Sequence, residues 1–210
     1  MSLEDLGWDA QFEAAFADFY SKGWEPARLI RDNKISYGAF LGDGTEMEVA
    51  LGGSVYHAAQ TDAELPAVGD WVALERGAEE NEYEAVIRGR LKRKTCLSRK
   101  SAGKASAEQV IAANVDWVCV VTDAGRDFNE RRLERYFEVI DRSGAQAMVL
   151  LNKADLFTEE QLESAKQKLL ALLPGLRVVA GSALKGDGLE SFLSPLKPGI
   201  TLALVGSSGV

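Results

Sequence analysis

The segment Asn152-Lys153-Ala154-Asp155 follows an apolar run and places an amide, a cation and a carboxylate within four residues. A carboxylate such as that of Asp155 can accept hydrogen bonds from N1 and N2 of guanine, which adenine cannot supply in that geometry. The Asn152 amide can tie neighbouring loops together, and the Lys153 stem can cover an apolar base face. The pattern predicts a guanine-binding loop. The alternative is a helix-opening turn, because so short a string also arises by chance.

Two other loops follow apolar runs. Gly206-Ser207-Ser208-Gly209-Val210 matches the first five positions of the phosphate loop G-x-x-x-x-G-K-[ST], whose backbone N–H groups cradle phosphates. The lysine and the magnesium-binding hydroxyl of that motif would fall beyond Val210, so a Gly/Ser-rich chain end is the alternative. The small residues of Ser182-Ala183-Leu184 allow a backbone N–H to approach the guanine O6, or they form an ordinary strand-to-helix turn.

These loops need a sheet that brings them together. From residue 116 onward, apolar strands alternate with amphipathic helices, which predicts a parallel sheet with helices on its faces. Ligands bind at the carboxyl ends of such strands, so we expect the three loops to meet at one edge. Asn129 is a candidate N-cap and Gly144 a helix stop, while Thr158 with Gln161 predicts a capping box. The expected strands are 116–122, 147–151, 177–180 and 200–205, and the expected helices are 131–142, 158–172 and 189–196.

The first half of the chain has a different pattern. Phe12, Phe16, Phe19 and Tyr20 recur at helical spacing, and Gly23 ends the helix that they predict. Five short strands follow at 27–31, 35–41, 47–51, 70–75 and 83–88, which predicts a small closed barrel. An OB-fold is the commonest barrel of this size and often binds oligonucleotides, although five strands alone also fit an SH3-like barrel.

The sequence between residues 88 and 104 carries eight basic and no acidic residues, in a chain with a net charge of −8. So focused a positive field attracts phosphate backbones, and the run therefore predicts contacts with RNA. A solvated linker is the alternative. The predicted RNA-binding residues are Arg88, Arg90, Lys92, Arg93, Lys94, Arg99, Lys100 and Lys104.

Composition excludes several classes of protein. With 210 residues, 46% hydrophobic and 27% charged, the chain has the composition of a soluble globular protein. Cys96, Cys119 and His57 stand apart, which argues against a metal site within this chain and favours the reducing cytosol. Glu4 and Asp5 stand where a secretory leader would be basic. No apolar stretch approaches the length of about 18 residues that a membrane-spanning helix needs. We therefore expect a cytoplasmic monomer without membrane contact.

The guanine-binding pattern precedes the phosphate loop, which is the reverse of the order in ordinary small GTPases and indicates a circular permutation. In this order the chain resembles the RsgA (YjeQ/EngC) family of circularly permuted GTPases over nearly its whole length. Besides the loops above, the resemblance is carried by Val68-Gly69-Asp70-Trp71-Val72, by Glu108-Gln109-Val110-Ile111-Ala112-Ala113-Asn114-Val115-Asp116, and by Arg132-Leu133-Glu134-Arg135-Tyr136.

The resemblance implies an N-terminal OB-fold, a permuted GTPase domain of the α/β class and a C-terminal zinc-binding segment. It implies a GTPase that acts late in assembly of the small ribosomal subunit and is stimulated by that subunit. The three loops would bind GTP or GDP, and the barrel with the basic run would bind ribosomal RNA. The expected domains are a helical extension at 1–25, the OB-fold at 26–97, a basic linker at 98–107 and an incomplete GTPase domain at 108–210.

The chain departs from the family by omission, since the phosphate-loop lysine, the switch loops, the magnesium-coordinating acid and the zinc cluster are all missing. We therefore expect a truncated form without catalytic residues of its own, which hydrolyses GTP poorly or not at all. Mg²⁺ and Zn²⁺ are expected only for a full-length member. The alternative function is a non-catalytic OB-fold RNA-binding module with a G-domain scaffold. An ATPase or kinase is disfavoured by the guanine-binding pattern.

Overall fold

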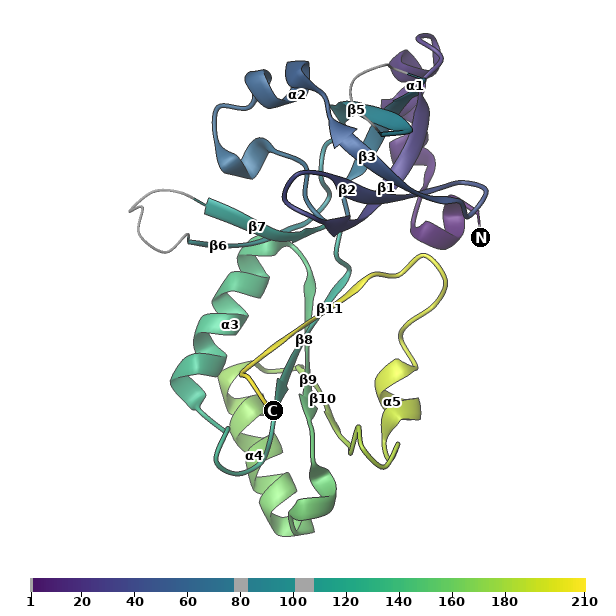
Figure 1. Cartoon of the computed structure of the whole chain (residues 1–210). Coiled ribbons are helices and arrows are strands. Elements are labelled where there is room, and N and C mark those ends of the chain that lie inside the picture. Colours follow the sequence, from purple (N-terminus) through teal and green to yellow (C-terminus); the bar gives the residue numbers. More distant parts are fainter. Residues whose placement is uncertain (1, 78–82, 101–107) are drawn as a thin grey trace. The chain divides into compact units, whose positions relative to one another are not determined.

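The computed structural model describes residues 2–77, 83–100 and 108–210 (Figure 1). The chain divides into two compact units, residues 1–114 and 115–210. Among the described residues, no helix is both long and apolar enough to span a membrane.

The first unit contains a closed barrel of five strands: β1 (Glu25–Asp32), β2 (Tyr37–Leu41), β3 (Glu46–Leu51), β4 (Trp71–Arg76) and β5 (Ala85–Arg90). The strands pair in the order β1-β2-β3-β5-β4, and β3 pairs with β5 in parallel while the other pairs are antiparallel. This Greek-key order is that of the OB-fold, so the prediction of a barrel is confirmed and the SH3-like alternative is wrong. Inward-facing side chains such as Leu29, Val49, Leu74 and Ile87 fill the barrel.

Helix α1 (Ala10–Tyr20) covers an aromatic cluster outside the barrel. The Asp9 side chain caps the helix by accepting hydrogen bonds from the backbone N–H groups of Gln11 and Phe12. Phe12 and Phe16 are buried against Trp71 of β4, as the helical spacing predicts. Tyr20, at the end of the helix, is 42% exposed, and its hydroxyl donates to Glu13.

Strands β6 (Cys96–Lys100) and β7 (Glu108–Ala113) form an antiparallel pair after the barrel. The predicted linker at 98–107 therefore begins inside a strand, and the rest of it, 101–107, lies outside the described residues. Short helices connect the other elements of this unit: η1 (Glu4–Leu6), α2 (Gly53–Ala58) and η2 (Asp62–Glu64). The sequence did not predict α2, which has only six residues and no buried side chain.

The β6–β7 pair is fastened to the barrel around Gly69. The Asn114 amide donates to the Gly69 carbonyl at 2.9 Å, and Arg28 donates to the Asn114 carbonyl at 3.0 Å. Gly69 has φ of +89°, and a Cβ there would lie 2.1 Å from the carbonyl oxygen of Ala113. Glycine at 69 is therefore required for this close approach of two backbones.

The second unit contains a parallel sheet in the order β10-β9-β8-β11. The strands are β8 (Trp117–Thr122), β9 (Gln146–Leu151), β10 (Arg177–Ala180) and β11 (Leu202–Gly206). The helices are α3 (Glu130–Ser143), η3 (Ala154–Leu156), α4 (Glu159–Leu172) and α5 (Leu189–Leu193). Asn129 caps α3, Gly144 ends it with φ of +81°, and Thr158 with Gln161 forms the capping box of α4, as predicted.

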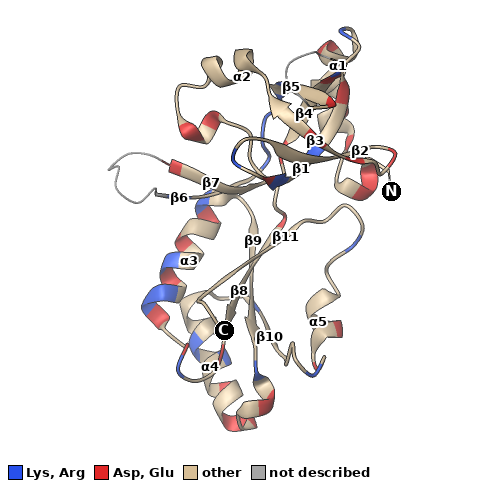
Figure 2. Ribbon diagram, in the orientation of Figure 1, with Lys and Arg blue, Asp and Glu red and all other residues tan. Residues whose placement is uncertain are grey.

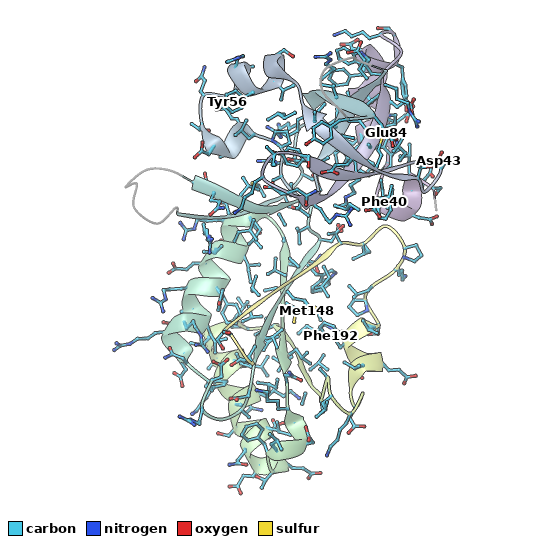
Figure 3. All side chains as sticks on the ribbon, in the orientation of Figure 1. Phe40, Asp43, Tyr56, Glu84, Met148 and Phe192 are labelled. Atoms are coloured by element: carbon cyan, nitrogen blue, oxygen red, sulfur yellow. The ribbon has the colours of Figure 1, made fainter. Side chains whose placement is uncertain are left out.

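Helices cover both faces of this sheet. Helices α3 and α4 pack against β8, β9 and β10, and α5 lies on the other side of the sheet (Figure 1). Met148 of β9 and Phe192 of α5, labelled in Figure 3, share one apolar cluster with Cys119. Burial raises the pKa of the Cys119 thiol to about 12, so this thiol stays protonated and packs as a small apolar side chain. The rigid sheet provides the edge from which the candidate loops extend.

Candidate guanine-nucleotide site

The three predicted loops meet at one edge of the parallel sheet. They follow β9, β10 and β11, whose carboxyl ends point the same way because all the strand pairs are parallel. Backbone hydrogen bonds join the first two loops: the N–H of Gly181 donates to Leu151 and the N–H of Ala154 donates to Gly181, both at 3.0 Å. The sheet thus brings residues that are more than 50 positions apart in sequence to one place.

Asn152 ties two of these loops together through its side chain. Its Oδ1 accepts a hydrogen bond from the backbone N–H of Ala183 at 3.0 Å. Its own backbone N–H donates to the Thr122 carbonyl at 2.8 Å. These bonds give the Asn152 amide the bridging position that its residue type predicted.

Lys153 links the guanine-binding pattern to the phosphate loop. Its backbone is left-handed, with φ of +57°, and its Nζ donates to the carbonyl of Gly209 at 2.6 Å. The aliphatic stem of Lys153 therefore spans the space between the loops after β9 and β11. A stem in this position can cover one face of a base while the ammonium group stays on the loop.

Asp155 is held as a carboxylate. A hydrogen bond from Ser182 and the ammonium group of Lys185, 3.1 Å from Oδ2, lower the pKa of this carboxyl below its ordinary value. Ser182 is buried, with 1% exposure, so its hydroxyl is fixed beside Asp155. An ionised carboxylate accepts hydrogen bonds only, as a selector for the N–H groups of guanine must.

The segment 206–210 leaves β11 as a short turn. Gly209 has φ of +80°, a conformation that glycine adopts without strain. The Ser207 hydroxyl donates to Oδ1 of Asp127 at 2.5 Å, and Nζ of Lys153 donates to the Gly209 carbonyl. The turn is therefore fastened at two points. The loop of Ser182 to Leu184 remains open beside it, with Leu184 94% exposed.

Comparison with known proteins agrees with this geometry. The family described as RsgA GTPase matches residues 90–210, which is more than half of the chain. The chain belongs to the RsgA GTPase family. The RsgA family membership that the motifs suggested is thereby confirmed.

Relatives of this family align along the whole chain. A protein named small ribosomal subunit biogenesis GTPase RsgA from Syntrophotalea carbinolica is 40% identical over 100% of this chain and 57% of its own length. One of the same name from Opitutus terrae is 41% identical over 100% of this chain and 58% of its own length. The chain therefore spans a little over half the length of these relatives.

A solved structure supports the fold. The crystal structure of YjeQ from Thermotoga maritima matches with a TM-score of 0.66 and 20% identity, over 89% of this chain and 61% of that one. Together with the barrel order and the parallel sheet, this match confirms the predicted combination of an OB-fold with a circularly permuted GTPase domain.

Several residues of the basic run have partners inside the first unit. Arg93 pairs with Asp70 through two hydrogen bonds of 2.8 and 2.7 Å and also donates to the carbonyls of Ala63 and Leu65. The Arg93 side chain is 9% exposed and that of Asp70 is 0% exposed. The guanidinium thus has its hydrogen-bonding edges occupied by the barrel and its neighbouring loop. Its position supports a structural role.

The remaining basic residues differ in exposure. Arg88 pairs with Glu75 at 2.6 Å, Arg90 donates to the carbonyls of Glu64 and Leu91, and Lys94 pairs with Asp9. Lys92, Lys94 and Arg99 are exposed, and the Arg99 guanidinium donates to Oε1 of Gln109 at 3.3 and 3.2 Å. The Lys100 side chain and all of Lys104 lie outside the described residues. In the second unit, acidic and basic residues alternate along α3 (Figure 2), so charge there is mixed.

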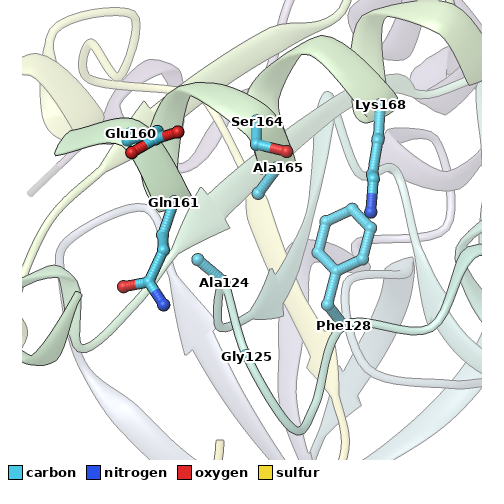
Figure 4. A pocket seen from close by; sticks show the side chains of 8 residues that line it. All are labelled: Ala124, Gly125, Phe128, Glu160, Gln161, Ser164, Ala165 and Lys168. Atoms are coloured by element: carbon cyan, nitrogen blue, oxygen red, sulfur yellow. The ribbon is translucent and has the colours of Figure 1, made fainter. Parts of the chain in front are cut away.

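A pocket of about 510 Å³ lies between the loop after β8 and α4. Phe128 and Lys168 face each other across one end, with the ammonium group 5.7 Å from the ring centre (Figure 4). Gly125 and Ser164 also line it. None of the predicted nucleotide-binding residues lines this pocket, so it is separate from the candidate site.

The described residues do not offer a metal site, since they contain no group of three His, Cys, Asp or Glu side chains that could hold an ion. The residues described here therefore do not fit zinc, and we assign no step to a metal. The structure adds residues to which the sequence patterns gave no role in the site: Asp123, Asp127, Arg132 and Lys185. The rule that ligands bind beyond the carboxyl ends of parallel strands would have pointed to the first two, which follow β8.

Proposed function

We propose that this chain is the OB-fold and nucleotide-binding part of a GTPase that acts on the small ribosomal subunit. The observation that carries the proposal is the meeting of three loops at one sheet edge, where Asn152 fixes the loop of Ala183 and Asp155 is held ionised. A guanine base would bind to the Asp155 carboxylate, and the exposed Leu184 and the stem of Lys153 offer apolar surface beside it.

The phosphates would bind to the turn at 206–210. Backbone N–H groups of such a turn, directly after a parallel strand, attract anions without a charged side chain. Transfer of a phosphoryl group also needs a lysine and a magnesium ion, which neutralise the negative charge that develops in the transition state. We propose that GTP, GDP and Mg²⁺ bind to the protein at the length of its relatives, and that residues 1–210 alone bind nucleotide weakly and hydrolyse GTP poorly or not at all.

Ribosomal RNA is the proposed partner of the first unit. Lys92 is exposed and available for phosphate contacts, which position a protein on RNA without reading its sequence. Arg88, Arg90, Lys94 and Arg99 would contribute by exchanging the partners that they have in this structure. Such a protein would work in the cytoplasm, as a monomer.

Turnover of GTP, measured on the protein at the length of its relatives with and without small ribosomal subunits, tests the proposal. We expect the subunits to accelerate turnover. Equal turnover in both reactions, with RNA binding preserved, would instead favour the non-catalytic RNA-binding module in which the second unit serves as a scaffold.

A further inference from the structure

The loop between β8 and α3 carries a carboxylate that the motifs do not assign. Asp127 lies on this loop, and its Oδ1 accepts the hydrogen bond from Ser207 at 2.5 Å. Ser207 is the second residue of the candidate phosphate loop, so the bond fastens two loops that follow neighbouring strands, β8 and β11. A carboxylate directly beside a site for anions is unfavourable unless another group neutralises it.

Arg132 is that neutralising group. Its Nη2 lies 2.7 Å from Oδ1 of Asp127, and the two side chains are 29% and 18% exposed. Arg132 belongs to the first turn of α3, where Asn129 caps the helix and fixes the backbone. The cation is therefore supplied by a rigid element, and the pair presents no net charge to the loop.

The surrounding backbone holds Asp127 in place. Asp123 Oδ1 accepts hydrogen bonds from the N–H groups of Gly125 and Asp127, at 2.8 and 2.9 Å. The buried hydroxyl of Thr122 donates to Oδ2 of Asp127 at 3.3 Å. Burial acts to raise the pKa of Asp127, but the bonds from Ser207 and Arg132 outweigh it and hold the pKa below its ordinary value. The group that faces Ser207 is thus a carboxylate.

From this geometry we propose that Asp127 is a positioning residue for the phosphate loop, acting through Ser207, and that Arg132 cancels its charge so that the loop can accept a nucleoside diphosphate. The inference rests on the proposed function, because it assigns the phosphates to residues 206–210. Asp127 and Arg132 position the phosphate-binding loop, while the guanine-binding residues position the base.

The test is a comparison of GDP with guanosine, since only GDP has phosphates. Four variants are compared with the wild-type chain: Arg132→Ala, Asp127→Asn, both together, and Arg142→Ala. Arg142 is the matched control, because it lies on the same helix in an exposed pair with Glu138. Thermal unfolding of each variant checks that it is folded.

Arg132→Ala leaves a negative charge beside the phosphates, and we expect it to weaken GDP binding about tenfold and to change guanosine binding less than about twofold. The double variant removes that charge but keeps a side-chain oxygen that can accept from Ser207, so it should recover most of the lost affinity. Asp127→Asn alone and Arg142→Ala should both bind GDP nearly as the wild type does. Equal losses for GDP and guanosine, or no recovery in the double variant, would overturn the inference.

A second measurement does not depend on nucleotide. The pKa of the Asp127 carboxyl, followed by NMR in the wild-type chain, should lie below the ordinary 3.8 and should rise in Ser207→Ala and in Arg132→Ala. A carboxyl that titrates identically in all three proteins would contradict the role of Asp127. If the wild-type chain binds neither ligand, the proposed function fails for this chain, and the titration still decides whether Asp127 holds Ser207.

Discussion

The side-chain oxygen of Asn152 accepts a hydrogen bond from the backbone N–H of Ala183 at 3.0 Å, across 31 positions of sequence. This bond joins the loop after β9 to the loop after β10. The bond holds the two loops together without any ligand. Preorganisation of this kind reduces the entropy lost on binding.

Substitution Asn152→Ala should loosen the guanine-binding loops. One neutral hydrogen bond is lost, so we expect GDP to bind about fivefold more weakly, which corresponds to about 1 kcal/mol. Calorimetric titration of GDP measures the change. Gln167→Ala, which removes an exposed amide on α4, is the control and should leave affinity unaltered. Identical affinities for wild type and Asn152→Ala would remove Asn152 from the site.

Substitution Asp155→Asn should change the preferred base. An amide in this position can donate a hydrogen bond to the O2 oxygen of xanthine, whereas the carboxylate accepts from the N2 amino group of guanine. Competition between GDP and xanthosine diphosphate measures the preference. Asp187→Asn alters an exposed carboxylate of the neighbouring loop and should keep the preference for guanine. A guanine preference that survives in Asp155→Asn would assign base selection to other groups.

Most of the fold follows from patterns in the sequence. Alternating strands and helices from residue 116 onward predict the parallel sheet, and Asn129, Thr158 and Gly144 mark helix ends because their chemistry is local. The β6–β7 pair was missed because dense basic residues around Leu97 conceal the alternation of a strand. A charge pattern likewise cannot show that Arg93 pairs with Asp70, which lies 23 residues earlier.

In the candidate site, too, local motifs could be predicted from the sequence and long-range contacts could not. Asn152, Asp155 and the turn at 206–210 carry short motifs, so their chemistry could be predicted and their meeting point followed from the sheet. Asp127 belongs to no motif. Its role depends on Ser207, 80 residues away, and only the arrangement of β8 beside β11 brings the two together.

Arg93→Ala should destabilise the first unit. It leaves the fully buried carboxylate of Asp70 without its cation, and breaking a buried pair costs about 3 to 5 kcal/mol. Urea unfolding, followed by the fluorescence of Trp71 and its neighbours, measures the loss. Arg76→Ala removes one partner of an exposed pair with Glu25 and should cost less than about 1 kcal/mol. A small loss for both variants would show that the Asp70 pair contributes little.

Exposed basic residues should carry the affinity for RNA. Replacing Lys92 and Arg99 by Gln should lower the slope of log affinity against log salt by about 0.7 to 0.9 for each lost phosphate contact. Binding of small-subunit rRNA at several salt concentrations measures this slope. Lys166→Gln neutralises an exposed lysine of α4 and is the control. An unaltered slope in the double variant would show that the basic run is a solvated linker that does not contact RNA.

The most direct test of the account is the NMR spectrum of the chain at saturating GDP and, separately, at the same concentration of ADP. We predict that GDP shifts the amide signals of Asn152, Ala183 and the turn at 206–210 together, and that ADP leaves the Asn152 and Ala183 signals in place because adenine lacks the donors that Asp155 accepts. Shifts that are absent with GDP, or equal for the two nucleotides, would contradict a guanine site at this edge of the sheet.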